Sequence, residues 1–212
     1  MALLAILLCC CVSAAAKAAD RDTQYWFTEN LSVRVDDSTT ITLDFNQRAR
    51  SSLAGGDQYL DRIMVDHAVA KGVLVGVGAA YQYNDREKEI RTFQQFTLTR
   101  GALSSRSRLE QRMFESGPDV IWRAVQRFQI AQPIGGSKQW TLIANGDLFF
   151  QLNRAKPADK LGLNQFRNQI GLKHQFTKAL SAQLTYMRQQ NIRDGRPDLV
   201  ATAPWVTLAW KL

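Results

Sequence analysis

The chain has 212 residues, 45% of them hydrophobic, and its 27 Lys and Arg against 19 Asp and Glu make a formal net charge of +8. Such a basic excess is typical of proteins that meet nucleic acid, anionic lipid or anionic solutes. After residue 18, no apolar run approaches the ~20 residues that a membrane-spanning helix needs. If the chain enters a membrane, we expect a closed β-barrel, because only helices and barrels satisfy their backbone hydrogen bonds in lipid.

The first residues have the pattern of an export signal. Residues 3–12 are apolar, and Ala16, Lys17 and Ala18 fit a small-x-small cleavage site. The main alternative, a transmembrane anchor, requires a longer apolar run. We therefore expect a signal peptide over 1–18 and one mature domain over 19–212. Loss of Lys17 would lower the formal charge to about +7, and nucleic acid fits an exported chain poorly.

All three cysteines, Cys9, Cys10 and Cys11, lie inside the expected signal. The mature domain would then contain neither a disulfide nor a cysteine-bound metal, and we expect no cofactor. Lipidation is disfavoured because no cysteine follows a small residue.

Segments of about 11 to 15 residues with alternating polarity recur from residue 25 to the C-terminus, the length of a tilted membrane-spanning strand with its overhang. They cover 25–35, 39–50, 59–70, 73–83, 89–100, 103–114, 120–131, 139–152, 163–176, 180–190 and 199–212. Bacterial barrels of this type have an even number of strands. We therefore expect ten or twelve strands in an antiparallel up-and-down transmembrane β-barrel.

The connections alternate in length when they are counted back from the C-terminus. Short turns at 71–72, 101, 133–138 and 177–178 are assigned to the periplasmic side, and connections near Gly55, Asp85, Asp119, Asp159 and Asp194 to the outside. We expect an outer aromatic belt of Tyr59, Tyr81, Tyr83, Trp122 and Phe150, and an inner belt of Trp140, Trp205 and Trp210.

The last segment carries Val206, Leu208, Trp210 and Leu212 on one face. Outer-membrane barrels typically end in such an apolar stripe, so we expect the barrel-assembly machinery as a partner during insertion. In segment 73–83, Gly76 and Gly78 lie opposite the apolar face and leave room for large groups inside the barrel.

Segment 103–114 is the most informative. Because side chains alternate along a strand, Arg106, Arg108, Glu110 and Arg112 share one face. A soluble β-protein would turn such a ladder outward. In an exported chain with an apolar closing strand, the ladder indicates a barrel with charges in its lumen and apolar groups toward lipid.

Several short motifs together resemble one known family. They are Trp26, Arg48, the ladder from Arg106 to Arg112, the sequence 147–150 and the sequence 164–171. In these the chain resembles the outer-membrane β-barrels of domain of unknown function 2490, over almost the whole mature chain. Asp147 stands where the family often has Glu, which leaves a carboxylate in the lumen. The resemblance implies a β-barrel in the outer membrane of a Gram-negative bacterium and no known reaction.

Alternation places eleven cations inside the barrel: Arg34, Arg48, Arg62, Arg91, Arg106, Arg108, Arg112, Arg123, Arg127, Arg167 and Lys173. It places four carboxylates there: Asp44, Asp66, Glu110 and Asp147. Charges inside a protein need partners or water. Either the lumen therefore contains water, or several arginines at the strand ends reach solvent.

We hypothesise a narrow pore that prefers anions. The residues expected to form its lumen or binding surface are Arg106, Arg108, Glu110, Arg112, Arg123, Arg127, Asp147 and Arg167. The alternative is a barrel plugged by Arg–carboxylate networks, which serves as a scaffold or a binding protein.

Catalysis and a soluble barrel are weaker alternatives. Neither His67 nor His174 has a serine two residues further on, the arrangement of outer-membrane lipid hydrolases, so we expect no enzyme. We also expect no metal site, because two isolated histidines do not make one. A lipocalin-like barrel would have the same alternation with its faces exchanged. Basic groups at the rim could contact lipopolysaccharide phosphates; they are Arg86, Lys88, Lys156, Lys160 and Arg193.

Overall fold

A computed structural model describes residues 19–117, 119–137, 139–154, 160–195 and 197–212. The expected signal peptide lies outside the described residues, as does Lys156. The strands are β1 (Asp20–Thr23), β2 (Tyr25–Arg34), β3 (Thr39–Ala49), β4 (Gln58–Ala70), β5 (Val73–Tyr83), β6 (Lys88–Arg100), β7 (Leu103–Phe114), β8 (Val120–Ile134), β9 (Trp140–Gln151), β10 (Gly162–Gln175), β11 (Leu180–Asn191) and β12 (Leu199–Lys211). A 3₁₀ turn, η1 (Ser52–Ala54), follows β3.

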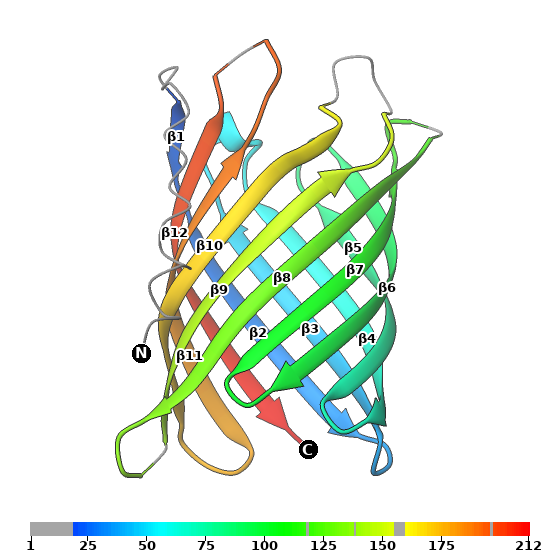
Figure 1. The fold of residues 1–212 in the computed structure, drawn as a ribbon. Helices are drawn as coiled ribbons and strands as arrows, with labels where there is room; N and C mark the ends of the chain where they lie inside the picture. The colour runs from blue at the N-terminus through cyan, green and yellow to red at the C-terminus, as the bar shows by residue number, and fades with distance from the viewer. Residues whose placement is uncertain (1–18, 118, 138, 155–159, 196) are drawn as a thin grey trace, which may run out of the picture.

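The strands form one sheet that closes into a barrel, with each of β2 to β12 hydrogen-bonded to its neighbours in chain order (Figure 1). Consecutive strands are antiparallel from β2 to β12. This confirms the all-β barrel expected from the alternating segments. The chain reverses at every strand because each connection is too short to cross over.

The barrel closes through a parallel pair, which the sequence did not indicate. Strand β12 pairs with β1 from Asp20↔Leu199 and with β2 from Trp26↔Trp205, so β1 and β2 follow it in a single register. The wall therefore has eleven long strands. The expectation of an even number was wrong because evenness is required only where the closing pair is antiparallel. The start of β1 and the C-terminus lie at opposite ends (Figure 1).

The short turns lie at the end of the barrel that holds the C-terminus, and the longer connections lie at the other end (Figure 1). In the 71–72 turn, Gly72 has φ +75°, and a Cβ there would lie 2.3 Å from the carbonyl oxygen of Thr99. At residues 35–38, the Asp36 carboxylate accepts hydrogen bonds from the backbone N–H groups of Ser38 and Thr39. These bonds, above all that from Ser38, lower the pKa of Asp36 below its ordinary value.

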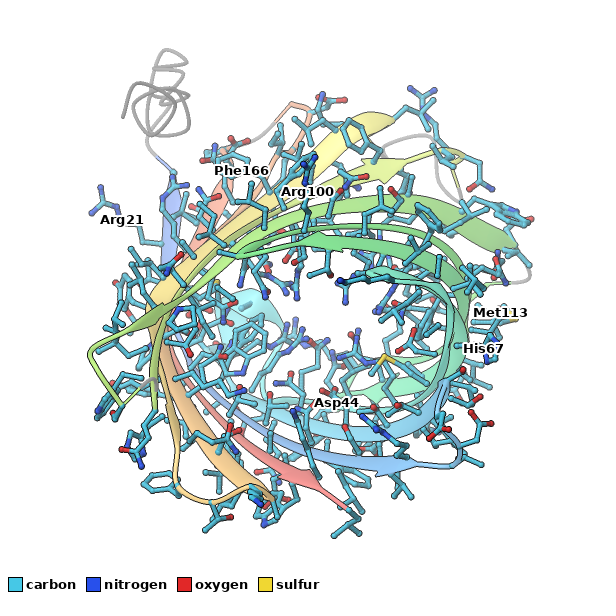
Figure 2. All side chains as sticks on the ribbon, turned by 60° about the horizontal axis from the view of Figure 1, so that its bottom comes forward. Arg21, Asp44, His67, Arg100, Met113 and Phe166 are labelled. Atoms are coloured by element: carbon cyan, nitrogen blue, oxygen red, sulfur yellow. The ribbon has the colours of Figure 1, made fainter. Side chains whose placement is uncertain are left out.

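The two faces of the wall have opposite character. Buried residues include Asp44, Arg108 and Glu110, whereas large hydrophobic side chains such as Val77 and Tyr186, each 56% exposed, lie on the outside. In a view tilted toward the end that holds the C-terminus, Asp44 lies inside the ring of strands, and His67, Met113 and Phe166 lie outside it (Figure 2). This arrangement is the reverse of a lipocalin-like barrel.

The outer face also carries neutral polar groups, and these bond to one another. Gln94 on β6 and Gln111 on β7 exchange amide hydrogen bonds of 3.1 and 3.4 Å. The Ser107 hydroxyl donates to the Gln126 amide oxygen on β8 at 2.6 Å, and Gln126 donates to Ser105. Such pairing reduces the cost of placing amides on a face whose other side chains are largely apolar.

Aromatic residues expected in the two belts lie on the outside of the barrel, with one correction. Tyr59 and Tyr81 each stack on Tyr83 on the outer wall, with ring centroids 5.2 and 5.3 Å apart. Trp205, however, points into the interior, where its ring meets Trp26 at 4.8 Å and donates to Thr28. Its position was assigned by nearness to the strand end, although its alternation with Val206 already indicated the inner face.

Candidate functional site

The charged wall of the interior is built by strand alternation on β6 to β10. Every second residue of β7 points inward, and the facing residues of β8, β9 and β10 do the same. This brings all eight residues of the expected site to the interior, namely Arg106, Arg108, Glu110 and Arg112 on β7, Arg123 and Arg127 on β8, Asp147 on β9 and Arg167 on β10. Arg108, Glu110, Arg123 and Asp147 are the buried ones.

Glu110 is the centre of one ion-pair cluster. The Nε and Nη2 groups of Arg123, on the next strand, donate to Glu110 Oε2 at 2.7 and 2.5 Å. Arg108 Nη1 lies 3.7 Å from the other carboxylate oxygen, and Arg91 Nε lies 4.0 Å from Oε2. Glu110 is only 3% exposed, so this one carboxylate compensates up to three guanidinium groups away from bulk water.

Glu89 is the centre of a second cluster that the sequence analysis missed. It is 2% exposed. It accepts two hydrogen bonds from Arg112, of 2.6 and 3.0 Å, and another of 2.9 Å from Arg91 Nε. The residue shares its strand face with Arg91, so alternation could have placed it inside. It was missed because it stands at the very start of its segment.

Two further pairs complete the charged wall. Arg127 holds Asp147 through two parallel bonds, Nε to Oδ1 at 2.6 Å and Nη2 to Oδ2 at 2.8 Å. On the opposite part of the wall, Arg62 Nη2 donates to Asp44 at 2.8 Å. The bidentate geometry engages both oxygens of Asp147 with a single arginine.

The direction of these pairs is their most informative property. Among the described residues, each interior ion pair joins neighbouring strands or two positions on one strand, such as Arg123 with Glu110 and Arg91 with Glu89. The ion pairs therefore follow the wall and do not cross the interior.

Polar contacts that reach past a neighbouring strand are few. Gln95 on β6 donates to Asp66 on β4 at 2.6 Å, above Gly76 of β5. A Cβ at Gly76 would lie 2.1 Å from Asp66 Oδ1, and one at Gly78 would lie 2.3 Å from the tip of the Phe93 ring. The glycines thus leave the space that large interior groups need, as the sequence predicted.

One side of the interior is packed and apolar. Trp26, Met187 and Ala203 form a buried cluster against Trp205. The guanidinium carbons of Arg48 and Arg167 lie 4.1 and 4.9 Å from the Trp26 ring centroid, within the range of cation–π contacts. The interior thus has a charged wall on β6 to β10 and a tryptophan cluster on β2, β11 and β12.

Three interior arginines form no ion pair with a carboxylate among the described residues. Arg48 donates to Asn46 and Gln58, and Arg167 donates to Gln189. Arg106 has no hydrogen-bond acceptor in the described part of the chain, and its Nε is buried. These groups give the interior an excess of positive charge.

Other expected positions lie elsewhere. Arg34, expected inside, is exposed at the strand end because the wall stops there and its side chain reaches solvent. His67 is exposed and bonds Thr39 through Nδ1 at 3.0 Å, whereas His174 packs between Trp140 and Phe176. The described residues contain no group of three or more His, Cys, Asp or Glu placed to hold a metal ion. In the same residues, no helix is long and apolar enough to cross a membrane.

Several of the rim cations are paired. Lys88 lies 3.2 Å from Glu115, Lys160 lies 2.9 Å from Asp194, and Arg193 lies 3.2 Å from Asp20. Both Lys88 and Glu115 are more than half exposed, so these contacts leave the lysine accessible at the rim.

Comparison with known proteins agrees with this architecture. The family model described as "Protein of unknown function (DUF2490)" matches residues 23–200. An uncharacterized protein of Methylorubrum extorquens is 26% identical over 202 residues, which are 88% of this chain and 87% of that protein. The NanC porin has a similar structure, with a TM-score of 0.60 at 11% identity over 90% of this chain and 99% of NanC. At that identity the likeness to NanC shows the fold alone.

Proposed function

The chain belongs to the DUF2490 family of proteins of unknown function, and from the geometry of its interior we propose that it forms a narrow pore that prefers anions. The observation that carries the proposal is the direction of the interior ion pairs. A plug made of salt bridges would join strands on opposite sides of the barrel, whereas the described pairs join neighbours. Such pairs hold the long arginine side chains against the wall.

The sign of the selectivity follows from the cations that have no carboxylate partner. Arg48, Arg106 and Arg167 have no carboxylate within ion-pair distance among the described residues, and Asp147, which acts on Arg106 and Arg167, is already paired with Arg127. A ring of positive charge in a narrow pore lowers the energy of an anion inside it and raises that of a cation.

We place the pore in the outer membrane of a Gram-negative bacterium. The exposed hydrophobic residues on the outside of the barrel and the interior charges support this placement, as does the porin-like fold. Its partners there would be outer-membrane lipid along the wall and lipopolysaccharide phosphates at the rim, near Arg86 and Lys88. During insertion, the barrel-assembly machinery would recognise the apolar stripe of β12. Porin-like architecture and the absence of a His–Ser pair favour transport over catalysis.

A non-conducting barrel is the second candidate. It is favoured by the tryptophan cluster, because Trp26 on β2 stacks with Arg167 three strands away on β10 and fills one side of the interior. Such a barrel would serve as a membrane scaffold or as a binding protein.

Planar-bilayer recording of the folded barrel in a KCl gradient separates the two. The pore predicts discrete conductance steps and a reversal potential shifted toward the chloride equilibrium potential. Replacement of the unpaired interior cation in Arg106→Gln should reduce the chloride preference. Arg86→Gln removes an exposed rim charge and should change it much less. A folded, heat-modifiable barrel without conductance, or one that prefers potassium, would contradict the pore.

A further inference from the structure

Arg106 occupies an unusual position in the charged wall. Its neighbours across the sheet are Thr97 on β6 and Arg127 on β8, and neither offers a carboxylate. The nearest acid along the row is Asp147, and both of its oxygens are already engaged by Arg127. Across the sheet the guanidinium of Arg106 therefore faces a neutral side chain and a like charge, and Asp147 and Glu110 act on it from beyond ion-pair distance.

Other cations converge on the same part of the interior. Arg62 extends from β4, and Arg108 of β7 reaches that same strand, where its Nη2 lies 3.8 Å from the sulfur of Met64. The charge of Arg62 also acts on those of Arg106, Arg108 and Arg167. Arg62 uses Nη2 to hold Asp44, while its Nε, like that of Arg106, is buried without an acceptor. Guanidinium groups from β4, β7, β8 and β10 thus face a common region with donor capacity that the described protein residues leave unused.

Unused guanidinium donors in a protein interior indicate what the region can bind. A buried charge without a partner is costly, and a guanidinium offers donors in a fixed planar fork that matches two oxygens of one anion. Carboxylate and phosphate groups accept such paired bonds, whereas chloride has no second acceptor atom.

We propose that Arg106 and Arg62 form a binding site for a small oxyanion, a carboxylate or a phosphate, in the interior of the barrel. The role of this site for an anion that crosses the pore rests on the proposed pore function. The binding of the anion rests on the arginine cluster alone. Arg106 contributes its whole guanidinium, and Arg62 contributes the donors that Asp44 leaves free. The neighbouring Arg127 and Arg108 keep the local potential positive while their own bonds to Asp147 and Gln95 hold them in place.

The thermal unfolding midpoint of the detergent-solubilised barrel tests binding independently of conduction. Inorganic phosphate and acetate are titrated separately against chloride at matched ionic strength, because a ligand of the folded state raises the midpoint in a saturable way. We expect saturation with at least one oxyanion. For Arg106→Gln the apparent affinity should be about tenfold weaker or more, since a hydrogen bond to a charged group is lost. Arg106→Lys, which keeps the charge without the fork, should also bind more weakly than the wild type.

The matched control is Arg100→Gln, which removes an exposed cation of the same type at the end of β6 and should keep the wild-type response. Equal responses to both oxyanions and to chloride would overturn the site, as would an unchanged affinity in Arg106→Gln. Saturation with phosphate alone or acetate alone supports the site and identifies its ligand class. A barrel that binds the oxyanion but passes no current would refute the pore and leave the site intact, so the two failures are distinguishable.

Discussion

Removal of the carboxylate of Glu110 tests the idea that shared carboxylates hold the charged wall together. In Glu110→Gln, the Nε and Nη2 groups of Arg123 lose an ionised acceptor at 2.7 and 2.5 Å. Arg108 and Arg91 lose a compensating charge at 3.7 and 4.0 Å. Glutamine has nearly the same shape, so the change concerns charge and leaves packing almost unchanged.

The magnitude follows from burial. Glu110 is 3% exposed, and breaking a buried ion pair by removing one partner costs about 3–5 kcal/mol. The side chain of Glu115, which pairs with Lys88 at 3.2 Å, is 61% exposed, so Glu115→Gln should cost less than about 1 kcal/mol. The two variants make the same chemical change on one strand and in the connection that follows it.

Urea unfolding of the barrel in lipid vesicles, followed by tryptophan fluorescence, measures both free energies of unfolding. The expected result is a midpoint for Glu110→Gln far below those of the wild type and Glu115→Gln, with unchanged slopes. If the pore conducts, the extra uncompensated cation should also increase its chloride preference. A loss of stability in Glu110→Gln no larger than that in Glu115→Gln would refute the reasoning, because water would then be solvating the arginines in place of the carboxylate.

Two further predictions concern the wall itself. Gly78→Val should destabilise the barrel by about 1–3 kcal/mol, because a Cβ would lie 2.5 Å from a backbone oxygen and 2.3 Å from the Phe93 ring; Gly117→Ala, with nothing within 4 Å, is the control in the same urea assay. On the outer face, Gln94→Leu alone should cost about 1–3 kcal/mol, because the Gln111 amide N–H loses its acceptor while its oxygen still accepts from Thr92. The double change with Gln111→Leu should recover part of that loss, and additive losses in a double-mutant cycle would show that the two amides do not interact.

The likeness to a porin and the direction of the ion pairs bear on different questions. The fold resemblance concerns the path of the backbone, which many barrels share whatever their lumens contain. The charged wall concerns side chains that this chain supplies, such as Glu89 and Glu110, each serving more than one arginine. A proposal about conduction therefore depends on the second observation.

The alternating pattern by itself determined the fold class, the faces of nearly all strands and the position of each described turn. Strand alternation has a period of two residues. Once the apolar residues identify the outer face of the wall, a charged ladder such as the one from Arg106 to Arg112 is therefore assigned to the inner face. For the same reason, the eight expected site residues lie on one surface. The misplaced Trp205 and the overlooked Glu89 both came from giving position near a strand end more weight than alternation, which already held the information on their faces.

Only the tertiary structure decided how the barrel closes and which charges are compensated. The parallel pair of β12 with β2 joins residues almost 180 positions apart, and nothing local in either segment indicates a partner's direction. Likewise, strand alternation identifies Arg106 and Arg127 as interior cations. The register between strands then places Asp147 opposite Arg127, where the two form an ion pair, and leaves Arg106 without a carboxylate partner. Register is a property of pairs of strands, so the charge that distinguishes this interior appears only when the sheet is assembled.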